Sequence, residues 1–273
     1  MYERIFSKQI LLNIVVRDGD IIMDEKIIYL LKFGKKEHIE EFVSGCLYCS
    51  TAETFWKIEK DTKIKGHGDE LESGFKVHAS KMELEDVETH KKIEINQDSV
   101  GLIHIDSAKK IPVFCMFAVY DDDCINSSNG NKKIHLIERK QRIIKEHFPN
   151  ADTVAIIKNP KKFINNIKRD INLDIKEGLV HYFNIDNNGP MDMEYIQYLM
   201  QDAKPKIEGK KKKYTFYEKN VFRILFCKDK YFKDEQEYRV IFPKEKIENS
   251  TKYLFSNLKD IEVKSIDDFF RDM

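Results

Sequence analysis

The sequence contains no hydrophobic run long enough to cross a membrane. Its longest apolar stretches, such as residues 10–16 and 111–120, fall short of the roughly 18 residues that a membrane helix needs, and they suit buried strands. The first residues include Glu3, Arg4 and Lys8, and no small-residue cleavage site follows them. We therefore expect a soluble cytoplasmic protein with no membrane partner.

The sequence also lacks an excess of charge of one sign. It has 47 Lys and Arg residues against 47 Asp and Glu residues, which argues against a histone-like polycation and against an acidic solvating protein. Hydrophobic residues make up 41% of the chain, so disorder throughout is not expected. The charges form separate blocks, basic at residues 132–145 and 204–213 and acidic at 69–72, 83–88 and 121–123. This pattern favours a specific contact with a partner over bulk electrostatic attraction.

Cysteines are few and odd in number, so we expect no disulfide framework. Cys46 and Cys49 have a zinc-like spacing, and Cys115 and Cys124 are candidates to complete a site. However, the first pair lies in a strand-like stretch and the second pair is too widely spaced for a zinc knuckle. We expect buried free thiols and no metal site.

Hydrophobic periodicity predicts an α+β fold, with a mixed, mainly antiparallel sheet or sheets and flanking helices. We find no repeat and no low-complexity linker, so residues 1–273 are expected to form a single domain, with or without an inserted or lobed region near 120–215. The expected helices cover residues 35–43, 51–60, 135–148 and a segment that begins at 159–160. The expected strands cover 10–16, 27–33, 47–50, 75–78, 92–95, 102–105, 112–120, 153–157, 179–183, 214–217, 221–227 and 237–242, with those from 75 to 105 as a meander.

Three segments stand out by their order and spacing. The first runs from Phe33-Gly34 through Gly45-Cys46-Leu47-Tyr48-Cys49-Ser50-Thr51 to Phe55. The second is His67-Gly68-Asp69-Glu70-Leu71-Glu72-Ser73-Gly74. The third runs from Cys227-Lys228 through Glu235-Gln236-Glu237-Tyr238-Arg239 to Pro243. This arrangement resembles a large, mostly uncharacterised domain family of bacteria and their phages. Members have a Gly-x-Leu-Tyr element, an Arg-Gly-Asp-x-x-Glu-Gly loop and a late Glu-x-Glu-aromatic-Arg strand. In this chain His67 stands where the family has Arg, and Ser73 precedes the final glycine.

The Glu-x-Glu element is also similar to the catalytic strand of ADP-ribosyltransferases. That resemblance implies NAD as the substrate, Glu237 as the catalytic carboxylate and Glu235 as the residue that orients the acceptor. Alternate strand residues point to one face, so both carboxylates are expected to face one cleft. The candidate NAD-binding residues are Tyr48, Ser50, Thr51, His67, Asp69 and Glu72.

Each candidate group also has a structural interpretation. The two glutamates would form a solvated strand face paired with Lys228, Lys230 and Lys233. The loop at residues 67–72 would bind a ligand or metal ion, or would be a polar turn in which the aspartate caps backbone amides. The run Lys210, Lys211, Lys212 and Lys213 would contact a phosphate backbone or a partner, or would be an exposed hairpin tip.

Three functional hypotheses follow. The first is an NAD-using, ADP-ribosyltransferase-like enzyme of phage–bacterium conflict, acting in a bacterial host cell. The second is a non-catalytic phage inhibitor, oligomeric itself, that blocks a host antiviral defence complex; the 18 Phe and 12 Tyr residues suit protein–protein contact. The third is a nucleic-acid-binding or nuclease module, in which Lys228, Asp229 and Glu235 would surround Mg²⁺. The partner is thus a host or phage protein, with nucleic acid less favoured.

Overall fold

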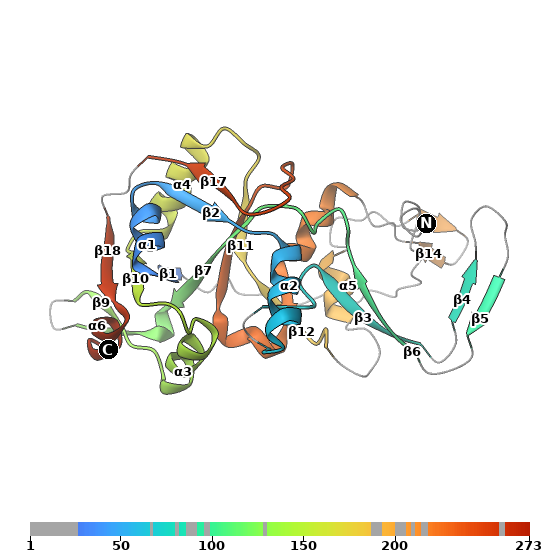
Figure 1. Ribbon diagram of the computed structural model, residues 1–273, viewed down its shortest axis with the longest axis horizontal. Helices are drawn as coiled ribbons and strands as arrows, with labels where there is room; N and C mark the ends of the chain where they lie inside the picture. The colour runs from blue at the N-terminus through green and yellow to red at the C-terminus, as the bar shows by residue number, and fades with distance from the viewer. Residues whose placement is uncertain are drawn as a thin grey trace.

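The computed structural model describes residues 27–65, 68–79, 82–85, 92–95, 99–127, 130–186, 193–199, 206–208, 211–213, 218–256 and 260–273. Its centre is a six-stranded antiparallel sheet in the order β11-β16-β7-β1-β10-β18 (Figure 1). In that order the strands are Lys176–Leu179, Glu237–Ile241, Val113–Tyr120, Ile27–Gly34, Thr153–Ile157 and Ile261–Ser265. The predicted α+β class is confirmed. The strands expected at 10–16 and 214–217 lie outside the described residues.

Helices cover both faces of the sheet because neighbouring residues of a strand point to opposite sides. On β1, Leu30 packs in a core with α1 (Lys36–Val43) and α4 (Pro160–Asp170). The next residue, Leu31, packs in a second core with α3 (Glu138–His147) and α6 (Ile266–Arg271). The sheet is therefore the middle layer of three (Figure 1).

A third core lies beside the sheet, around α2 (Ala52–Thr62), α5 (Met193–Leu199) and the 3₁₀ helix η2 (Glu218–Phe226). The prediction of a strand at 221–227 is wrong. Val221, Ile224 and Leu225 are all buried, and their spacing of three and four suits one face of a helix. Only Cys227–Asp229 is extended, as β15.

The strands between residues 74 and 104 do not form the predicted meander. β3 (Gly74–Ala79) pairs with β6 (Ser99–His104), and β4 (Met82–Glu85) pairs with β5 (Lys92–Ile95). The chain therefore runs outward through β3 and β4 and returns through β5 and β6, as one long hairpin that projects from the body (Figure 1).

Shorter pairings complete the fold. The expected strand at 179–183 divides at Val180, because Leu179 pairs with β16 whereas β12 (His181–Phe183) pairs in parallel with β15. The other pairs are β2 (Cys46–Cys49) with β17 (Thr251–Leu254), β8 (Cys124–Asn126) with β9 (Lys132–Ile134), and β13 (Lys206–Glu208) with β14 (Lys211–Lys213). Residues 120–215 supply β10 and β11 to the main sheet, and the division of the chain into domains stays a prediction.

The five cysteines are free thiols. Cys46 and Cys49 are buried in β2, in the strand-like stretch where the sequence placed them. Burial raises the pKa of the Cys49 thiol to about 12. These two residues contribute to packing rather than to reactivity.

Helix α3 starts later than the sequence pattern predicts. It begins at Glu138 rather than at His135, so Ile137 precedes the helix and is 56% exposed. Ile144 is buried against the sheet. Among the apolar residues Ile137, Ile143, Ile144 and Phe148, only Ile144 is thus buried.

This difference gives a direct test. We expect Ile144→Ala to lower the free energy of unfolding by about 2–5 kcal/mol, because it opens a cavity in the core. Ile137→Ala should change it by less than about 0.5 kcal/mol, because that side chain faces solvent. Urea unfolding measures both; equal costs would contradict the placement of α3.

Candidate functional site

A cavity of about 300 Å³ opens beside the sheet, between β1, β7, β16, α2 and the loop that precedes β3. Aromatic and aliphatic side chains form much of its wall, and ionisable groups gather on one side. Its lining residues are Leu31, Lys32, Phe33, Tyr48, Ser50, Phe55, Gly68, Asp69, Glu72, Val113, Cys115, Met116, Phe117, His147, Phe148, Lys228, Glu235, Glu237 and Arg239.

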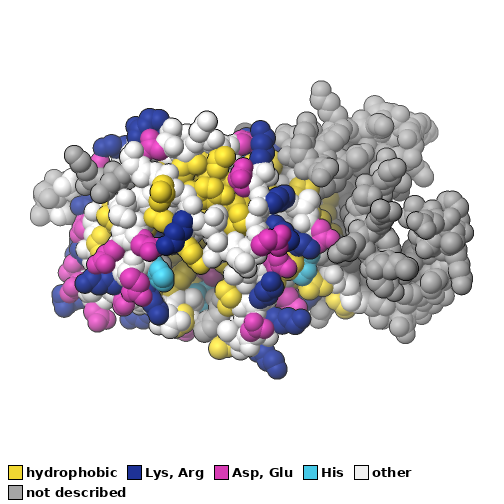
Figure 2. All heavy atoms as spheres, turned by 45° about the horizontal axis from the view of Figure 1, so that its top comes forward, with side chains coloured by type: hydrophobic (Ala, Val, Ile, Leu, Met, Phe, Trp, Pro, Cys, Tyr) yellow, Lys and Arg dark blue, Asp and Glu magenta, His cyan; other side chains and the backbone are white. Residues whose placement is uncertain are grey.

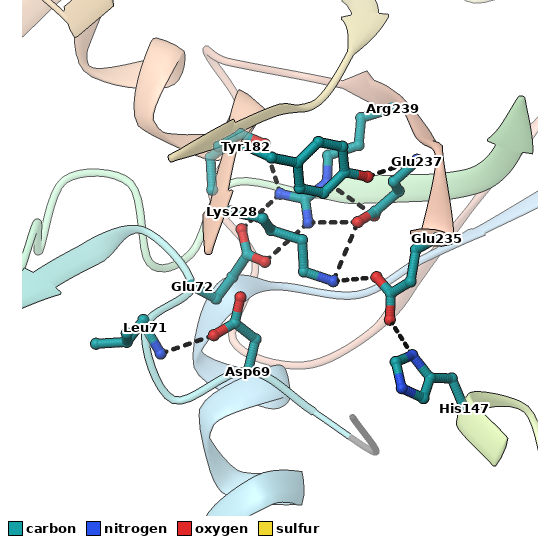
Figure 3. Close-up of polar contacts among 10 residues, drawn as sticks. Asp69, Leu71, Glu72, His147, Tyr182, Lys228, Glu235, Glu237 and Arg239 are labelled. Carbon is teal, nitrogen blue, oxygen red and sulfur yellow. Dashed lines mark hydrogen bonds and ion pairs between the residues drawn. The ribbon is translucent and has the colours of Figure 1, made fainter. Parts of the chain in front are cut away.

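Arg239 lies at the centre of the ionisable groups and is fully buried. Its Nε and Nη2 donate to Glu237 at 2.8 and 2.9 Å, and its Nη1 and Nη2 donate to Glu72 at 2.5 and 2.8 Å (Figure 3). Nη1 also donates to the carbonyl oxygen of Leu225. All five N–H groups of the guanidinium therefore have an acceptor. Burial opposes the charge, but the ion pairs with Glu237 and Glu72 outweigh it and raise the pKa of Arg239 well above its usual value.

Lys228 on β15 joins two further carboxylates. Its Nζ lies 2.5 Å from Glu235 Oε2 and 3.2 Å from Glu237 Oε2 (Figure 3). Despite burial, these two charges raise the pKa of Lys228. Burial alone would raise the pKa of Glu237, but Arg239 and Lys228 hold it well below its ordinary value. Glu237 is therefore a buried anion.

The two predicted catalytic glutamates both line the cavity, but they lie on two different elements and not on one strand. Glu235 is the last residue of the 3₁₀ helix η3 (Lys230–Glu235), and Glu237 is the first residue of β16. Between them Gln236 adopts a left-handed conformation with φ of 42°, and its side-chain amide donates to Ala118 and Asp123. The prediction that strand alternation points both glutamates to one face is thus wrong, although both side chains line the same cavity.

The alternative of a solvated glutamate face is also wrong. Glu235 and Glu237 are each less than 10% exposed. Of the three lysines suggested as their partners, Lys228 is buried with them, whereas Lys230 and Lys233 are exposed. Glu235 has a second partner, His147 at the end of α3, whose Nδ1 lies 2.6 Å from its Oε1.

The loop before β3 supplies Asp69 and Glu72, both buried. Gly68 admits no side chain, because a Cβ there would lie 2.4 Å from the carbonyl oxygen of Phe55. Asp69 Oδ1 accepts a hydrogen bond from the Leu71 N–H at 2.9 Å, as a polar turn predicts. Trp56 on α2 donates to the Glu72 carbonyl oxygen and holds the loop from the other side.

The remaining predicted residues divide into four groups. Tyr48 and Ser50 line the cavity, and Tyr48 is half exposed. Thr51 instead caps α2, because its hydroxyl accepts from the Thr54 N–H. His67 and Lys210 lie outside the described residues, and Lys211, Lys212 and Lys213 form the short strand β14.

Sequence reasoning gave no site role to Arg239, and it missed His147 and Lys32 as cavity residues. Arg239 follows Glu237 by two residues on one strand, so alternation could have placed both on one face. Lys228 was considered only as a surface partner or a nuclease residue. His147 lies far from the motifs along the chain. Lys32 directly precedes Phe33-Gly34 of the first segment, so its position beside that motif was the signal that could have indicated it.

The same geometry bears on metal binding. Within the described part of the chain, no group of three or more His, Cys, Asp or Glu side chains is arranged to hold a metal ion. Lysine and arginine side chains instead form ion pairs with the carboxylates of Glu72, Glu235 and Glu237.

In the described part of the chain, no helix is long and apolar enough to span a membrane.

Comparison with models of known families gives no match, and neither curated proteins nor solved structures include a chain of significant similarity. The chemistry of the cavity must therefore carry the functional argument.

The central position of Arg239 makes a testable prediction. Arg239→Met should lower the free energy of unfolding by about 3–5 kcal/mol, because it removes the cation from the buried Glu72 and leaves Glu237 with Lys228 alone. Arg271→Met is the control, since Arg271 is mostly exposed and its pair with Asp268 should contribute at most about 1 kcal/mol. Denaturant unfolding gives both values, and a small cost at Arg239 would contradict the buried network.

Proposed function

We propose that this protein is an NAD-using enzyme similar to ADP-ribosyltransferases, and that it acts in conflict between phages and bacteria. The reaction would break the bond between nicotinamide and the ribose carbon, with the electron pair leaving on the ring nitrogen. An acceptor would then give a lone pair to that carbon and lose a proton. The observation that carries the proposal is the buried, ionised Glu237 in the cavity wall.

An anion in this position has a clear chemical use. Positive charge grows on the ribose as the bond breaks, and a preorganised carboxylate in a water-poor site stabilises such charge far better than water does. Arg239 and Lys228 keep Glu237 ionised and hold it still. Burial lowers the pKa of Lys32, which also lines the cavity and donates to the carbonyl oxygen of Cys115.

The cavity wall also suits a flat ring. Phe33 and Phe148 stack with ring centroids 5.5 Å apart, and Phe55 and Phe117 line the same space. Aromatic faces bind planar heterocycles well. A volume of about 300 Å³ is at the lower end for small-molecule sites, so it would hold the nicotinamide riboside end of NAD.

Glu235 and His147 supply a place for the acceptor's proton. Their side chains lie 2.6 Å apart at the cavity wall, and each is nearly buried. A carboxylate beside an imidazole is a common proton-accepting pair. In this proposal Glu235 acts on the acceptor side and Glu237 on the ribose side.

The test is release of nicotinamide from NAD by the purified full chain. Glu237→Gln should lower kcat by about 10²–10³-fold, because it removes the charge but nearly keeps the shape. Glu41→Gln is the control, since Glu41 pairs with Lys252 on the surface. Circular dichroism checks that each variant is folded. The absence of both nicotinamide release and an NAD-dependent thermal shift in the wild type would refute the proposal.

A second candidate function is a non-catalytic, oligomeric inhibitor that blocks a host defence complex. It is favoured by exposed apolar side chains on the β2–β17 pair, where Leu254 is 75% and Tyr48 51% exposed. Figure 2, in which the top of Figure 1 comes forward, shows hydrophobic side chains gathered among mixed charges. Exposed apolar patches mark contact surfaces in many soluble proteins.

Light scattering tests this second candidate. The wild type should have a mass that is a multiple of 32.4 kDa, and Leu254→Asp should reduce it towards one chain. Leu173→Asp is the matched control, because Leu173 is exposed elsewhere. A monomeric wild type would count against the oligomeric inhibitor.

A further inference from the structure

One carboxylate in the cavity wall has an oxygen that nothing in the described part of the chain satisfies. Asp69 is only 3% exposed, and its Oδ2 has no hydrogen-bond partner there, whereas Oδ1 accepts from Leu71. An unpartnered buried polar atom is costly, so it needs an explanation. Because Asp69 lines the cavity, a bound ligand can supply the missing partner.

The neighbouring cations do not satisfy this oxygen. Lys228 pairs with Glu235 and Glu237, and Arg239 gives all five of its donors to other acceptors. Figure 3 shows Asp69 facing this group while its only drawn bond runs to Leu71. Asp69 therefore lies beside the ion-pair network without being part of it.

The charges around Asp69 favour its neutral form. Burial and the adjacent Glu72 raise its pKa well above the ordinary value, and Lys228, Arg239 and the Leu71 N–H offset this only in part. Tyr195 on α5, a further titratable neighbour, is buried, and burial raises its own pKa. With Oδ1 already accepting a bond, the proton belongs on Oδ2, which makes that atom a donor.

We propose that Asp69 recognises the nicotinamide ring as a neutral carboxyl group, whose Oδ2 hydroxyl donates a hydrogen bond to the carboxamide oxygen. This inference rests on the proposed NAD chemistry and names the residue that selects the leaving group. A neutral donor beside Glu72 suits an uncharged amide and disfavours a carboxylate. The site should therefore prefer nicotinamide to nicotinic acid.

Two variants of Asp69 separate a donor from an anion. Asp69→Asn keeps the shape and a donor without a charge, whereas Asp69→Leu removes both. Calorimetry with nicotinamide should give an affinity for Asp69→Asn within about threefold of the wild type, and for Asp69→Leu at least about tenfold weaker, as expected for one lost hydrogen bond. Wild-type affinity should fall as the pH rises and Asp69 loses its proton, while that of Asp69→Asn should not. Nicotinic acid should bind the wild type more weakly than nicotinamide does.

A result in which Asp69→Asn binds as poorly as Asp69→Leu would overturn the inference, because an anion would then be required. Equal binding by Asp69→Leu and the wild type would overturn it as well. Both results leave the NAD proposal standing, since the wild type still binds nicotinamide. If the wild type binds neither NAD nor nicotinamide, the proposed function itself fails.

The pH dependence of the free energy of unfolding tests the protonation of Asp69 without a ligand. A carboxyl whose pKa is raised in the folded state contributes full stability below its unfolded pKa and loses that contribution as the pH rises through the folded pKa. The wild type should thus become less stable relative to Asp69→Asn as the pH rises. A difference that does not change with pH would contradict the neutral carboxyl.

Discussion

The structure around the cavity depends on one buried guanidinium. Arg239 extends from β16 and binds Glu72 of the loop before β3, Glu237 of its own strand and the carbonyl oxygen of Leu225 in η2. The loop, whose Glu72 is 167 residues away from Arg239 in the sequence, therefore meets β16 and η2 at one side chain. Removing the charge of Arg239 would leave the buried carboxylate of Glu72 without its cation, which costs more than the ion pair itself contributes. Together with Lys228, Arg239 also holds the pKa of Glu237 well below its ordinary value.

The sheet provides the rigid support for this contact. β16 pairs with β7 along Glu237 to Ile241, so Arg239 lies directly opposite Cys115. The left-handed turn at Gln236 then lets Glu235 and Glu237 approach Lys228 from η3 and from β16. A non-glycine residue adopts this conformation only when its surroundings compensate, and the two hydrogen bonds of the Gln236 amide do so. The strained backbone conformation is thus at Gln236, between the two candidate catalytic glutamates.

Hydrophobic periodicity was enough to predict the α+β class, most strands of the main sheet and helices α1 and α4. The motifs also identified six residues that line one cavity: Tyr48, Ser50, Asp69, Glu72, Glu235 and Glu237. Other features depend on long-range pairing that a local pattern does not contain: the nested hairpin of β3 to β6, the 3₁₀ helix η2, and the approach of His147 to Glu235. The raised pKa of Asp69 depends on its burial and on the nearby Glu72 in three dimensions, so no spacing rule could have indicated it.

The most direct test of this account is a double-mutant cycle between Glu72 and Arg239. The free energies of unfolding of the wild type, Glu72→Gln, Arg239→Met and the double variant give the coupling between loop and strand. Residues in one buried network couple by about 0.5–3 kcal/mol, and we expect a value of about 2 kcal/mol here. Costs that add to within about 0.5 kcal/mol would show that the two residues act independently. That result would contradict the claim that Arg239 holds the cavity together.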